Sequence, residues 1–387
     1  MCLKILHTSD WHLGKTFKET TFDLLQIQKQ ILEEIIEVVE EERPDIVLIA
    51  GDIFDNYNPP FEAEKVFYET LIKLSKHNCF IIVTAGNHDS PEKLQISKPL
   101  IMGKHPIFIM TNPFDNFSSL IFENDMFYIG FEKLFLKIKL KEKNKVVAIK
   151  VLPYLSEVRL GLSGEEFLNK INEILSEEPQ FSCDNFLLMS HIYVSGAQKS
   201  GSERILQIGG IEYISSEYLP KRADYIALGH LHRYQKIKNA VYSGSIYPFD
   251  LAEIEHKKGI CLWRENQVEF IEFKKMPQIK KLEFETIEDA INNVPEDKNL
   301  YYIVIKTPQS YTPTSIEKLL KAYKDKLINW QFSLTEKIQE PEIPDISSLN
   351  DAELFREFYK AKLNREPSED TLKVFLETLE EVKNATY

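Results

Sequence analysis

The chain has 387 residues, of which 43% are hydrophobic, and its formal net charge is −13. This size fits two or three domains, and the charge argues against bulk electrostatic attraction to nucleic acid while leaving room for a local basic groove. No apolar run reaches the ~18 residues of a membrane-spanning helix, and the N-terminus lacks the apolar region of a signal peptide. The four cysteines are scattered without CxxC spacing. We therefore expect a cytoplasmic protein with no membrane segment, disulfide framework or zinc knuckle.

Strand-like and helix-like patterns alternate over the first 250 residues. An apolar strand at 3–10 is followed by helical spacing over 21–42, which Pro44 ends. A second helix is predicted at 62–77, and further buried strands at 45–52, 79–89, 185–191 and 225–232. Near-continuous apolar strands that alternate with helices are typical of an α/β core with buried sheets.

The pattern changes after about residue 276. Residues 279–308 predict a strand, a short helix and a strand, and another helix is expected near 315–327, so a small α+β domain is predicted. The acidic, Pro-rich stretch 339–350 indicates a linker. Two short amphipathic helices are predicted after residue 351, and Ser368 is placed to cap the second.

The loop after the first strand, "TSDWHLGKT", ends like a phosphate-binding P-loop. That motif, G-x-x-x-x-G-K-[ST], requires glycine at position 9, where this chain has Ser9. A P-loop at this position would also place the negatively charged carboxylate of Asp10 next to the phosphates that the loop amides must bind. A metal-binding loop is therefore favoured over a nucleotide-binding one.

Five strands in a row end in side chains that commonly bind metal ions. Because open α/β sheets bind ligands at the carboxyl ends of their strands, we expect these side chains to converge. The i, i+2 spacing in the first and last pairs would put both members on one side of an extended chain. Glycines before three of the motifs would let the backbone turn sharply. The strand-end residues are Asp10 and His12; Asp52; Asn87, His88 and Asp89; His191; and His230 and His232.

These motifs supply two carboxylates, one amide oxygen and four imidazoles besides His88. That is too many ligands for one ion and suits two divalent ions about 4 Å apart with a shared carboxylate. Nitrogen and oxygen donors without thiolate favour Mn²⁺, Fe²⁺ or Zn²⁺ over Ca²⁺. Paired ions of this kind activate water and neutralise the charge of a phosphoryl group, so the predicted chemistry is phosphoester hydrolysis.

The ordered set D-x-H, G-D, G-N-H-D, H and G-H-x-H resembles the calcineurin-like metallophosphoesterases. The segments "AGNHDSPEKL", "SHIYVSGAQKSGSERILQIGG" and "YSGSIYPFD" are similar to the SbcD group of this family, the nuclease subunits of bacterial DNA-repair complexes. The resemblance implies a four-layer αββα sandwich, the nuclease domain, over residues 1–275. It extends more loosely to a capping domain at 276–337, a linker at 338–350 and ATPase-binding helices at 351–387.

The resemblance also implies roles for single residues. One ion would be held by Asp10, His12, Asp52 and His232, and the other by Asp52, Asn87, His191 and His230. His88 would protonate the leaving oxygen or stabilise transition-state charge, and Asp89 would orient His88. Asp55 stands where some relatives have a histidine, so no role is implied for it. Four cations near the motif loops are candidates for DNA contacts, although a solvated or paired surface cation is an equal alternative: Lys15, Lys199, Arg204 and Arg233.

The function implied by the resemblance is a metal-dependent DNA nuclease, a 3′–5′ exonuclease on double-stranded ends and an endonuclease on single strands and hairpins. It would act as a homodimer with a coiled-coil ATPase of the SbcC type, near the nucleoid. Mn²⁺ is the favoured ion, with Mg²⁺, Fe²⁺ and Zn²⁺ as alternatives. Two other functions stay open, because the same site serves other phosphoesterases: a phosphatase or phosphodiesterase with a non-DNA substrate, and a non-catalytic tether of DNA ends.

Overall fold

The computed structural model describes most of the chain, and its described residues fall into two compact units, Met1–Phe332 and Ser333–Tyr387. No helix among these residues is long and apolar enough to cross a membrane. The described ranges are 2–17, 20, 22–96, 105–115, 121–201, 203, 213–264, 266–297, 299–306, 312–333, 351–363, 366–369 and 371–376.

A six-stranded sheet forms one half of the core, in the order β14-β13-β1-β2-β3-β4. The strands β1 to β4 are parallel, so their carboxyl ends meet at one edge, while β13 and β14 add antiparallel neighbours. Helix α1 begins after Asp23, whose carboxylate accepts from the Leu25 amide, and ends before Pro44. The elements are β1 Lys4–Thr8, α1 Leu24–Glu42, β2 Ile46–Ala50, α2 Phe61–Leu74, β3 Phe80–Thr84, α3 Pro91–Ile96, β4 Ile107–Met110, β13 Gly259–Arg264 and β14 Gln267–Glu272.

An eight-stranded sheet forms the other half, in the order β11-β12-β10-β9-β8-β7-β6-β5. Its centre, from β8 through β9 and β10 to β12, is parallel. The elements are β5 Phe122–Glu123, β6 Phe127–Glu132, β7 Phe135–Leu140, β8 Lys145–Leu152, α5 Glu157–Leu160, α6 Gly164–Ser176, β9 Asn185–His191, β10 Tyr225–Gly229, β11 Gln235–Ile237 and β12 Ala240–Tyr242.

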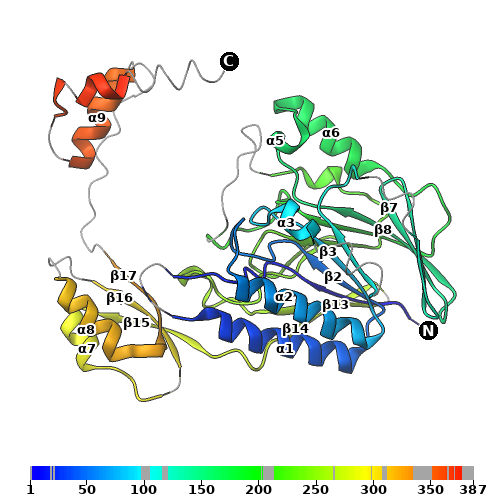
Figure 1. Cartoon of the computed structure of the whole chain (residues 1–387), viewed down its shortest axis with the longest axis horizontal. Coiled ribbons are helices and arrows are strands. Elements are labelled where there is room, and N and C mark those ends of the chain that lie inside the picture. The colour runs from blue at the N-terminus through cyan, green and yellow to red at the C-terminus, as the bar shows by residue number, and fades with distance from the viewer. Residues whose placement is uncertain are drawn as a thin grey trace. The chain divides into compact units, whose positions relative to one another are not determined.

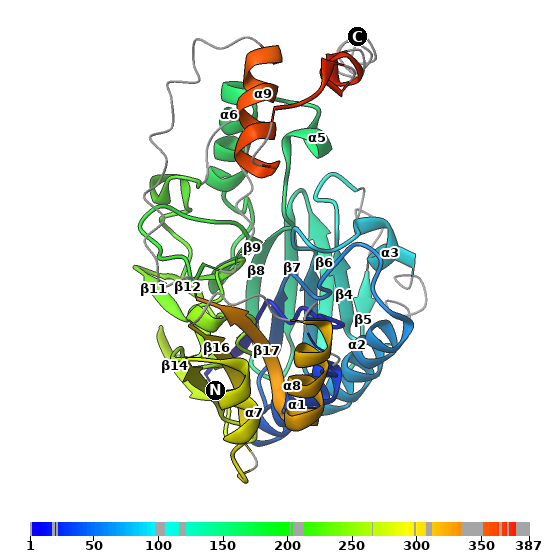
Figure 2. The same ribbon diagram turned by 90° about the vertical axis from the view of Figure 1, so that its left-hand side faces the viewer.

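Alternating side chains join these sheets into four layers. Val47 and Ile49 of β2 pack with α1 and α2, whereas Leu48 packs with residues of the second sheet. On the far side of that sheet, Leu188 of β9 packs with Phe167 of α6. Figures 1 and 2 show the helices on the outer sides of the two sheets. The predicted α/β sandwich is therefore confirmed.

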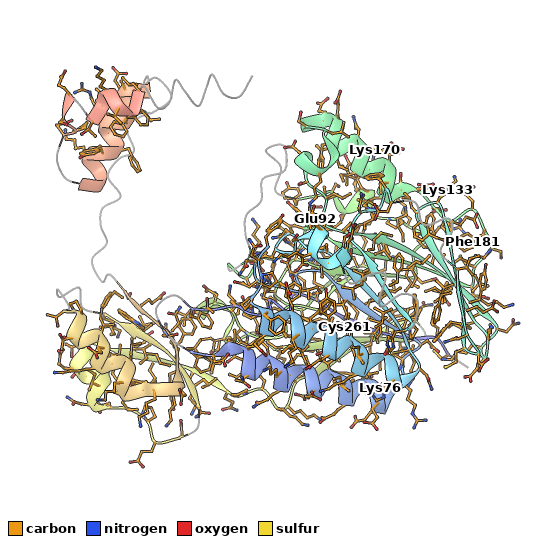
Figure 3. The ribbon with its side chains drawn as sticks, viewed as in Figure 1. Lys76, Glu92, Lys133, Lys170, Phe181 and Cys261 are labelled. Carbon is orange, nitrogen blue, oxygen red and sulfur yellow. The ribbon has the colours of Figure 1, made fainter. Side chains whose placement is uncertain are left out.

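Side chains fill the interior of this core, where Cys261 of β13 lies, while Lys133 and Lys170 lie at its periphery (Figure 3). All four cysteines are free, in agreement with the absence of a predicted disulfide framework.

A third, three-stranded parallel sheet follows the core, as β15 Ile279–Phe284, β16 Leu300–Ile305 and β17 Leu327–Phe332. It carries α7 Ile287–Asn292 and α8 Pro313–Tyr323, as the predicted small domain requires. The predicted helix at 315–327 is too long, since α8 ends at Tyr323 and Leu327 begins β17. Lys324, with a φ of 47°, turns the chain there. Tyr302 and Ile328 join the core cluster beneath α1 and α2, so this sheet packs directly on the larger core.

The second unit contains α9 Asp351–Leu363 and a further helical stretch at 371–376. The Ser368 hydroxyl accepts from the Thr371 amide at 3.2 Å, as the predicted cap requires. The rings of Phe355 and Phe375 stack at 4.0 Å, so the two apolar stripes face each other. The predicted linker at 338–350 lies outside the described residues, and the domain boundaries stay predictions.

Candidate metal centre

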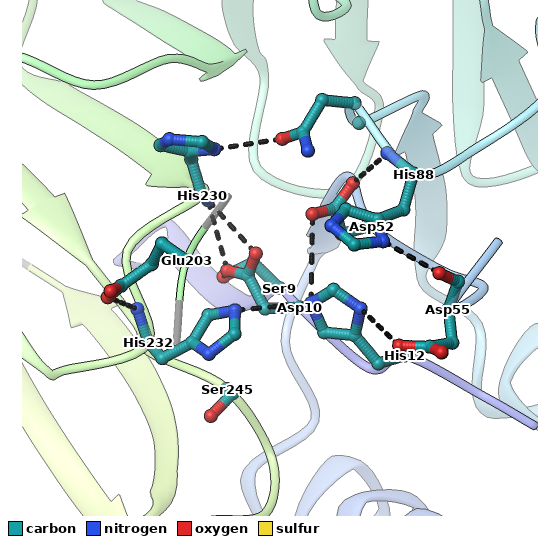
Figure 4. Close-up of polar contacts among 12 residues, drawn as sticks. Ser9, Asp10, His12, Asp52, Asp55, His88, Glu203, His230, His232 and Ser245 are labelled. Carbon is teal, nitrogen blue, oxygen red and sulfur yellow. Dashed lines mark hydrogen bonds and ion pairs between the residues drawn. The ribbon is translucent and has the colours of Figure 1, made fainter. Parts of the chain in front are cut away.

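The eight strand-end residues proposed as ligands or acid come together at one site between the two sheets, although they are distant in sequence. Figure 4 shows Asp10, His12, Asp52, His88, His230 and His232 at this site. The first sheet supplies its members from the ends of β1, β2 and β3, and the second supplies its members from β9 and β10. All of them are buried: Asp10, His12, Asp52, Asn87, His88, His191, His230 and His232.

One side of this site groups Asp10, His12 and His232. Donor atoms of these three residues lie within 4.8 Å of one another, close enough to bind one ion. Nε2 of His12 is 3.2 Å from Nε2 of His232 and 3.7 Å from Oδ2 of Asp52. The carboxylate of Asp10 also accepts from the His230 amide at 3.0 Å, which links the first sheet to the second.

The other side groups Asp52, Asn87, His191 and His230. Oδ2 of Asp52 is 3.3 Å from Nε2 of His191, and Oδ1 of Asn87 is 3.0 Å from the same nitrogen. Nδ1 of His230 lies 2.8 Å from that amide oxygen. Asp52 therefore contacts both groups, the position that a shared carboxylate requires.

Hydrogen bonds behind two of the rings fix which nitrogen faces the centre. Nδ1 of His191 is 2.8 Å from the Ala50 carbonyl, and Nδ1 of His232 is 3.0 Å from the Glu253 carboxylate. Both oxygens accept, so each Nδ1 carries a proton and Nε2 is the ring atom that faces the centre. There it meets another electron-pair donor, from His12 or Asn87. When these Nε2 atoms are unprotonated, the converging lone pairs need a cation between them, and the donor set fits divalent metal ions.

The backbone at the site differs from the predicted extended chain. Asp10, His12, Asp52 and His230 have φ values of 53°, 44°, 49° and 99°, in the left-handed region that non-glycine residues rarely adopt. The i, i+2 spacing therefore does not act through strand alternation. The amides of Asp10 and His12 instead donate to the carbonyls of Gly51 and Asp52 at 3.0 Å each, which holds the turned loop beside β2. Such strain persists only where surrounding contacts fix it, as at functional sites.

The glycines beside the motifs provide space as well as turns. Only Gly51 has a positive φ, of 85°; Gly86 and Gly229 do not. A Cβ on Gly86 would lie 2.1 Å from Oδ1 of Asp52, and one on Gly229 would lie 2.0 Å from the Ala50 carbonyl oxygen. The predicted sharp turn is therefore wrong as the reason for these two glycines, because close packing of strand ends excludes a side chain there.

Burial and the charges of neighbouring side chains shift the pKa values of the residues in the site. Burial lowers the pKa of His12 to about 4 and that of His230 to about 3, so both rings are neutral near pH 7 and can donate a lone pair. Burial would raise the pKa of Asp52, but the surrounding imidazoles hold it well below its ordinary value. For His191 the effect of burial is outweighed by Asp52, which raises the pKa to about 9. A proton and a bound cation would compete for this position.

His88 lies beside the candidate ligands, and its hydrogen-bond partners differ from theirs. Its Nδ1 is 2.7 Å from the carbonyl oxygen of Asp55, and its backbone amide donates to Oδ1 of Asp52 at 2.8 Å. The carboxylate of Asp89, predicted to orient His88, accepts from the amides of Gly86, Ile53 and Phe54 at 2.8–3.1 Å. Asp89 thus holds the loops after β2 and β3 together, and its role in orienting His88 stays a prediction.

The four candidate DNA-binding cations have varied surroundings. Lys15 pairs with Asp55 at 2.9 Å, Lys199 lies 5.1 Å from the centre of the Tyr193 ring, and Arg233 donates to Gln198 at 3.0 Å. Arg204 lies outside the described residues. The pairing of Lys15 favours a structural role for that lysine.

Sequence reasoning missed several polar residues around the centre. Asp55 places a carboxylate oxygen 3.5 Å from Nδ1 of His12. Glu203 accepts from the His232 amide at 3.0 Å, and the buried Glu253 pairs with the buried Lys258 behind the His232 ring. Spacing along the chain gives no signal for these residues, because each acts on a partner that only the fold brings close.

Comparisons with known proteins identify a family and relatives of this chain. The family model described as calcineurin-like phosphoesterase matches residues 3–234. The D subunit of the SbcCD nuclease of Bacillus subtilis (strain 168) is 29% identical over 97% of this chain and 97% of its own length. Its namesake in Staphylococcus epidermidis is 31% identical over 92% of this chain and 93% of its own length. Among solved structures, a dimetal phosphatase from Danio rerio matches 67% of this chain and 91% of its own length, at 11% identity and a TM-score of 0.40.

Proposed function

Because the chain belongs to the calcineurin-like phosphoesterase family, within its SbcD group of SbcCD nuclease components, we propose that this metal-dependent nuclease cleaves DNA ends and hairpins in DNA repair. The observation that carries the proposal is the pair of ligand groups that share Asp52. The similarity over nearly the whole chain favours a nuclease over a phosphatase of the same superfamily.

We propose that two divalent ions occupy the two groups. Asp10, His12, Asp52 and His232 would hold one, and Asp52, Asn87, His191 and His230 the other. When bound, such ions activate water and neutralise the charge of a phosphoryl group. The mixed imidazole and oxygen donors favour Mn²⁺, with Mg²⁺, Fe²⁺ or Zn²⁺ as alternatives.

His88 is the proposed acid. Since the Asp55 carbonyl accepts from Nδ1, that contact stabilises a doubly protonated ring, and Nε2 is then the atom that gives a proton to the leaving oxygen. The T-shaped contact with the ring of His12, at 4.7 Å between centroids, holds His88 beside the proposed ligands.

The proposal includes partners. We propose a homodimer that binds DNA and works with a coiled-coil ATPase of the SbcC type through the C-terminal helices. It is supported by the names of the relatives, which describe them as subunits of a larger nuclease, and by the separate helical unit after residue 332. On this proposal the enzyme is a 3′–5′ exonuclease on duplex ends and an endonuclease on hairpins and single strands.

A cleavage assay tests the function. End-labelled hairpin and blunt duplex DNA are incubated with the purified chain in Mn²⁺ or Mg²⁺, with and without a candidate ATPase, and a phosphopeptide serves as the competing substrate. We expect Mn²⁺-dependent cleavage of DNA at the hairpin and from the 3′ end. Turnover of the phosphopeptide without DNA cleavage would instead identify a phosphatase, and DNA-end bridging by inactive Asp52→Ala protein that still supports repair would identify a tether.

A further inference from the structure

A fully buried ion pair lies behind the ring of His232. Oε2 of Glu253 is 2.5 Å from Nζ of Lys258, and both side chains have no exposed surface. Oε1 of the same carboxylate is 3.0 Å from Nδ1 of His232. Nζ of Lys258 also donates to the His232 carbonyl at 3.0 Å and to the Ser245 hydroxyl at 2.7 Å. Figure 4 shows Ser245 beside the His232 ring.

The Glu253–Lys258 ion pair lies where it can determine which nitrogen of the His232 ring carries the proton. A buried carboxylate needs a partner charge and hydrogen bonds to stay ionised, and Lys258 and Ser245 provide them. An ionised Glu253 can only accept from Nδ1, which leaves the lone pair of a neutral ring on Nε2. A neutral acid could donate its own O–H to Nδ1 and turn the ring to the tautomer whose Nε2–H points at the centre.

We infer that Glu253, held ionised by Lys258, is a positioning residue of the metal centre: it fixes the tautomer and orientation of His232 so that Nε2 can bind an ion. The inference rests on the metal site of the proposed function and deepens it. Carboxylates that accept from a ligand histidine commonly set its metal affinity, and their loss weakens binding about 10–100-fold.

The effect should be confined to one ion. His191, on the other side of the site, is oriented by the backbone carbonyl of Ala50 and not by Glu253. A change at position 253 should therefore weaken the ion that His232 holds and leave the ion beside His191 almost unchanged. A merely structural role would lower the stability of the whole protein and both affinities together.

The experiment measures Mn²⁺ binding to metal-free full-length protein by isothermal titration calorimetry. We expect Glu253→Gln to weaken one of two Mn²⁺ sites about 10–100-fold. The control is Glu34→Gln, which removes another buried carboxylate that accepts from the amides of Lys274 and Lys275 at 2.7 and 3.0 Å, on residues outside the centre. It should lower stability without changing either affinity.

A double variant separates tautomer control from packing. In Glu253→Gln, Lys258 draws the amide oxygen to itself and leaves the amide NH₂ facing Nδ1, which forces the wrong tautomer. In Glu253→Gln/Lys258→Met the amide is free to turn its oxygen to Nδ1–H, so most of the Mn²⁺ affinity should return. Nitrogen-15 NMR of the ring reads the tautomer directly and should show Nδ1–H in the wild type and the double variant, but Nε2–H in the single variant.

Unchanged Mn²⁺ affinities and an unchanged tautomer in Glu253→Gln would overturn the inference, as would a double variant that binds no better than the single one. A wild-type chain that binds no divalent ion would overturn the proposed metal site itself. The two failures are therefore distinguishable by the wild-type titration.

Discussion

The imidazole of His88 stands among the candidate ligands, and donor atoms of His12, Asp55 and His88 also lie within 4.8 Å of one another. Two contacts argue against a third ion there. The carboxylate of Asp55 is neutralised by Lys15 at 2.9 Å, and Nδ1 of His88 is engaged by the Asp55 carbonyl. These contacts leave Nε2 of His88 as the atom for the proposed acid role.

His88→Ala should retain both metal ions and lose activity. If the ring serves only as an acid, its removal lowers the rate of DNA cleavage by about 10²–10⁴, the usual effect of losing an acid–base group. Asp52→Ala, by contrast, removes the shared carboxylate and should lose metal together with activity. Elemental analysis of both purified variants decides this, since a His88→Ala protein lacking an ion would identify His88 as a ligand.

A second histidine, His7 of β1, is buried between the sheets with Nδ1 2.9 Å from the Tyr225 hydroxyl, and burial lowers its pKa to about 3. The unfolded chain binds a proton at this residue below about pH 6.5, whereas the folded chain does not. Stability therefore falls as the pH drops from 6.5 toward 3, by about 2 kcal/mol at pH 5.

Replacement of His7 should remove this acid sensitivity. Between pH 7 and pH 5 the free energy of unfolding of the wild type should fall by about 2 kcal/mol more than that of His7→Gln. Urea denaturation of metal-free protein at both pH values measures the difference. Equal losses in the two proteins would show that His7 is not the group that titrates.

At the scale of the elements, the ends of β2, β3 and β10 approach so closely that glycine is required. Gly86→Ala would place a methyl group 2.1 Å from Oδ1 of Asp52. Overpacking of this kind costs about 1–3 kcal/mol, and displacement of the shared carboxylate should also weaken Mn²⁺ binding. Gly130→Ala in β6 is the matched control, because its Cβ would meet no atom closer than 3.5 Å. Thermal melting and Mn²⁺ titration of both variants compare them, and equal behaviour would contradict the packing argument.

The strands that carry the site were predictable, whereas much of the second sheet was not. β2, "IVLIA", is an uninterrupted apolar run, and β9, "NFLLMSH", has an apolar centre and ends in the candidate ligand His191, so composition alone locates both strands. β8, "KVVAIKVL", contains a lysine that interrupts the run. Lys150 is buried because its ammonium group donates to the carbonyls of Ile174 and Leu175 at the end of α6, a partnership that no local pattern encodes.

Within the site, too, some residues were predictable from the sequence and others were not. The candidate ligands were predictable because each follows a strand within a recognisable motif. Glu253 is 21 residues from the histidine it contacts, and Asp55 is separated from His12 by the whole of α1 and β2. Their roles depend on the packing of loops from different strands, which is why the sequence predicted the candidate ligands but not the residues that orient them.

At the scale of the whole molecule, the candidate centre joins the two halves of the core. The first sheet provides Asp10, Asp52 and Asn87, and the second provides His191 and His230. Divalent ions held between the two sheets should have a much higher affinity for the folded state than for the unfolded chain. They should therefore stabilise the sandwich as well as support catalysis.

Removal of metal should therefore lower thermal stability. An ion present at 100 times its dissociation constant contributes about 2.7 kcal/mol, and each kcal/mol shifts the melting temperature of a large domain by roughly 2–4 °C. Differential scanning calorimetry of EDTA-treated protein should show a melting temperature lower by about 5–10 °C per ion. Added Mn²⁺ should restore it in the wild type but not in Asp52→Ala. Identical melting with and without metal would contradict a shared site between the sheets.

The C-terminal unit has the composition of a docking element. Residues 338–387 carry 6 Lys and Arg and 12 Asp and Glu, a net charge of −6. The Phe355–Phe375 stack holds its helices together, and large apolar side chains remain exposed: Leu354, Phe358, Val374 and Leu376. Two such short helices bury little surface alone, since isolated helices below about 12–15 residues are marginal in water. They need a further surface, which we propose is the base of an ATPase coiled coil, with folding back on the core as the alternative.

Truncation after Ile338 separates these alternatives. The first compact unit ends at Phe332, so the truncated chain retains the entire candidate centre and should keep Mn²⁺-dependent cleavage of single-stranded DNA nearly intact. Co-purification with the ATPase should be lost, because the exposed apolar side chains and the acidic charge are removed together. Leu354→Asp/Phe358→Asp in the full-length chain is the matched point variant and should lose the ATPase without loss of core stability. Full ATPase affinity in the truncated chain would contradict docking through this unit, and a much lower melting temperature of the truncated core would show that the helices pack on the core instead.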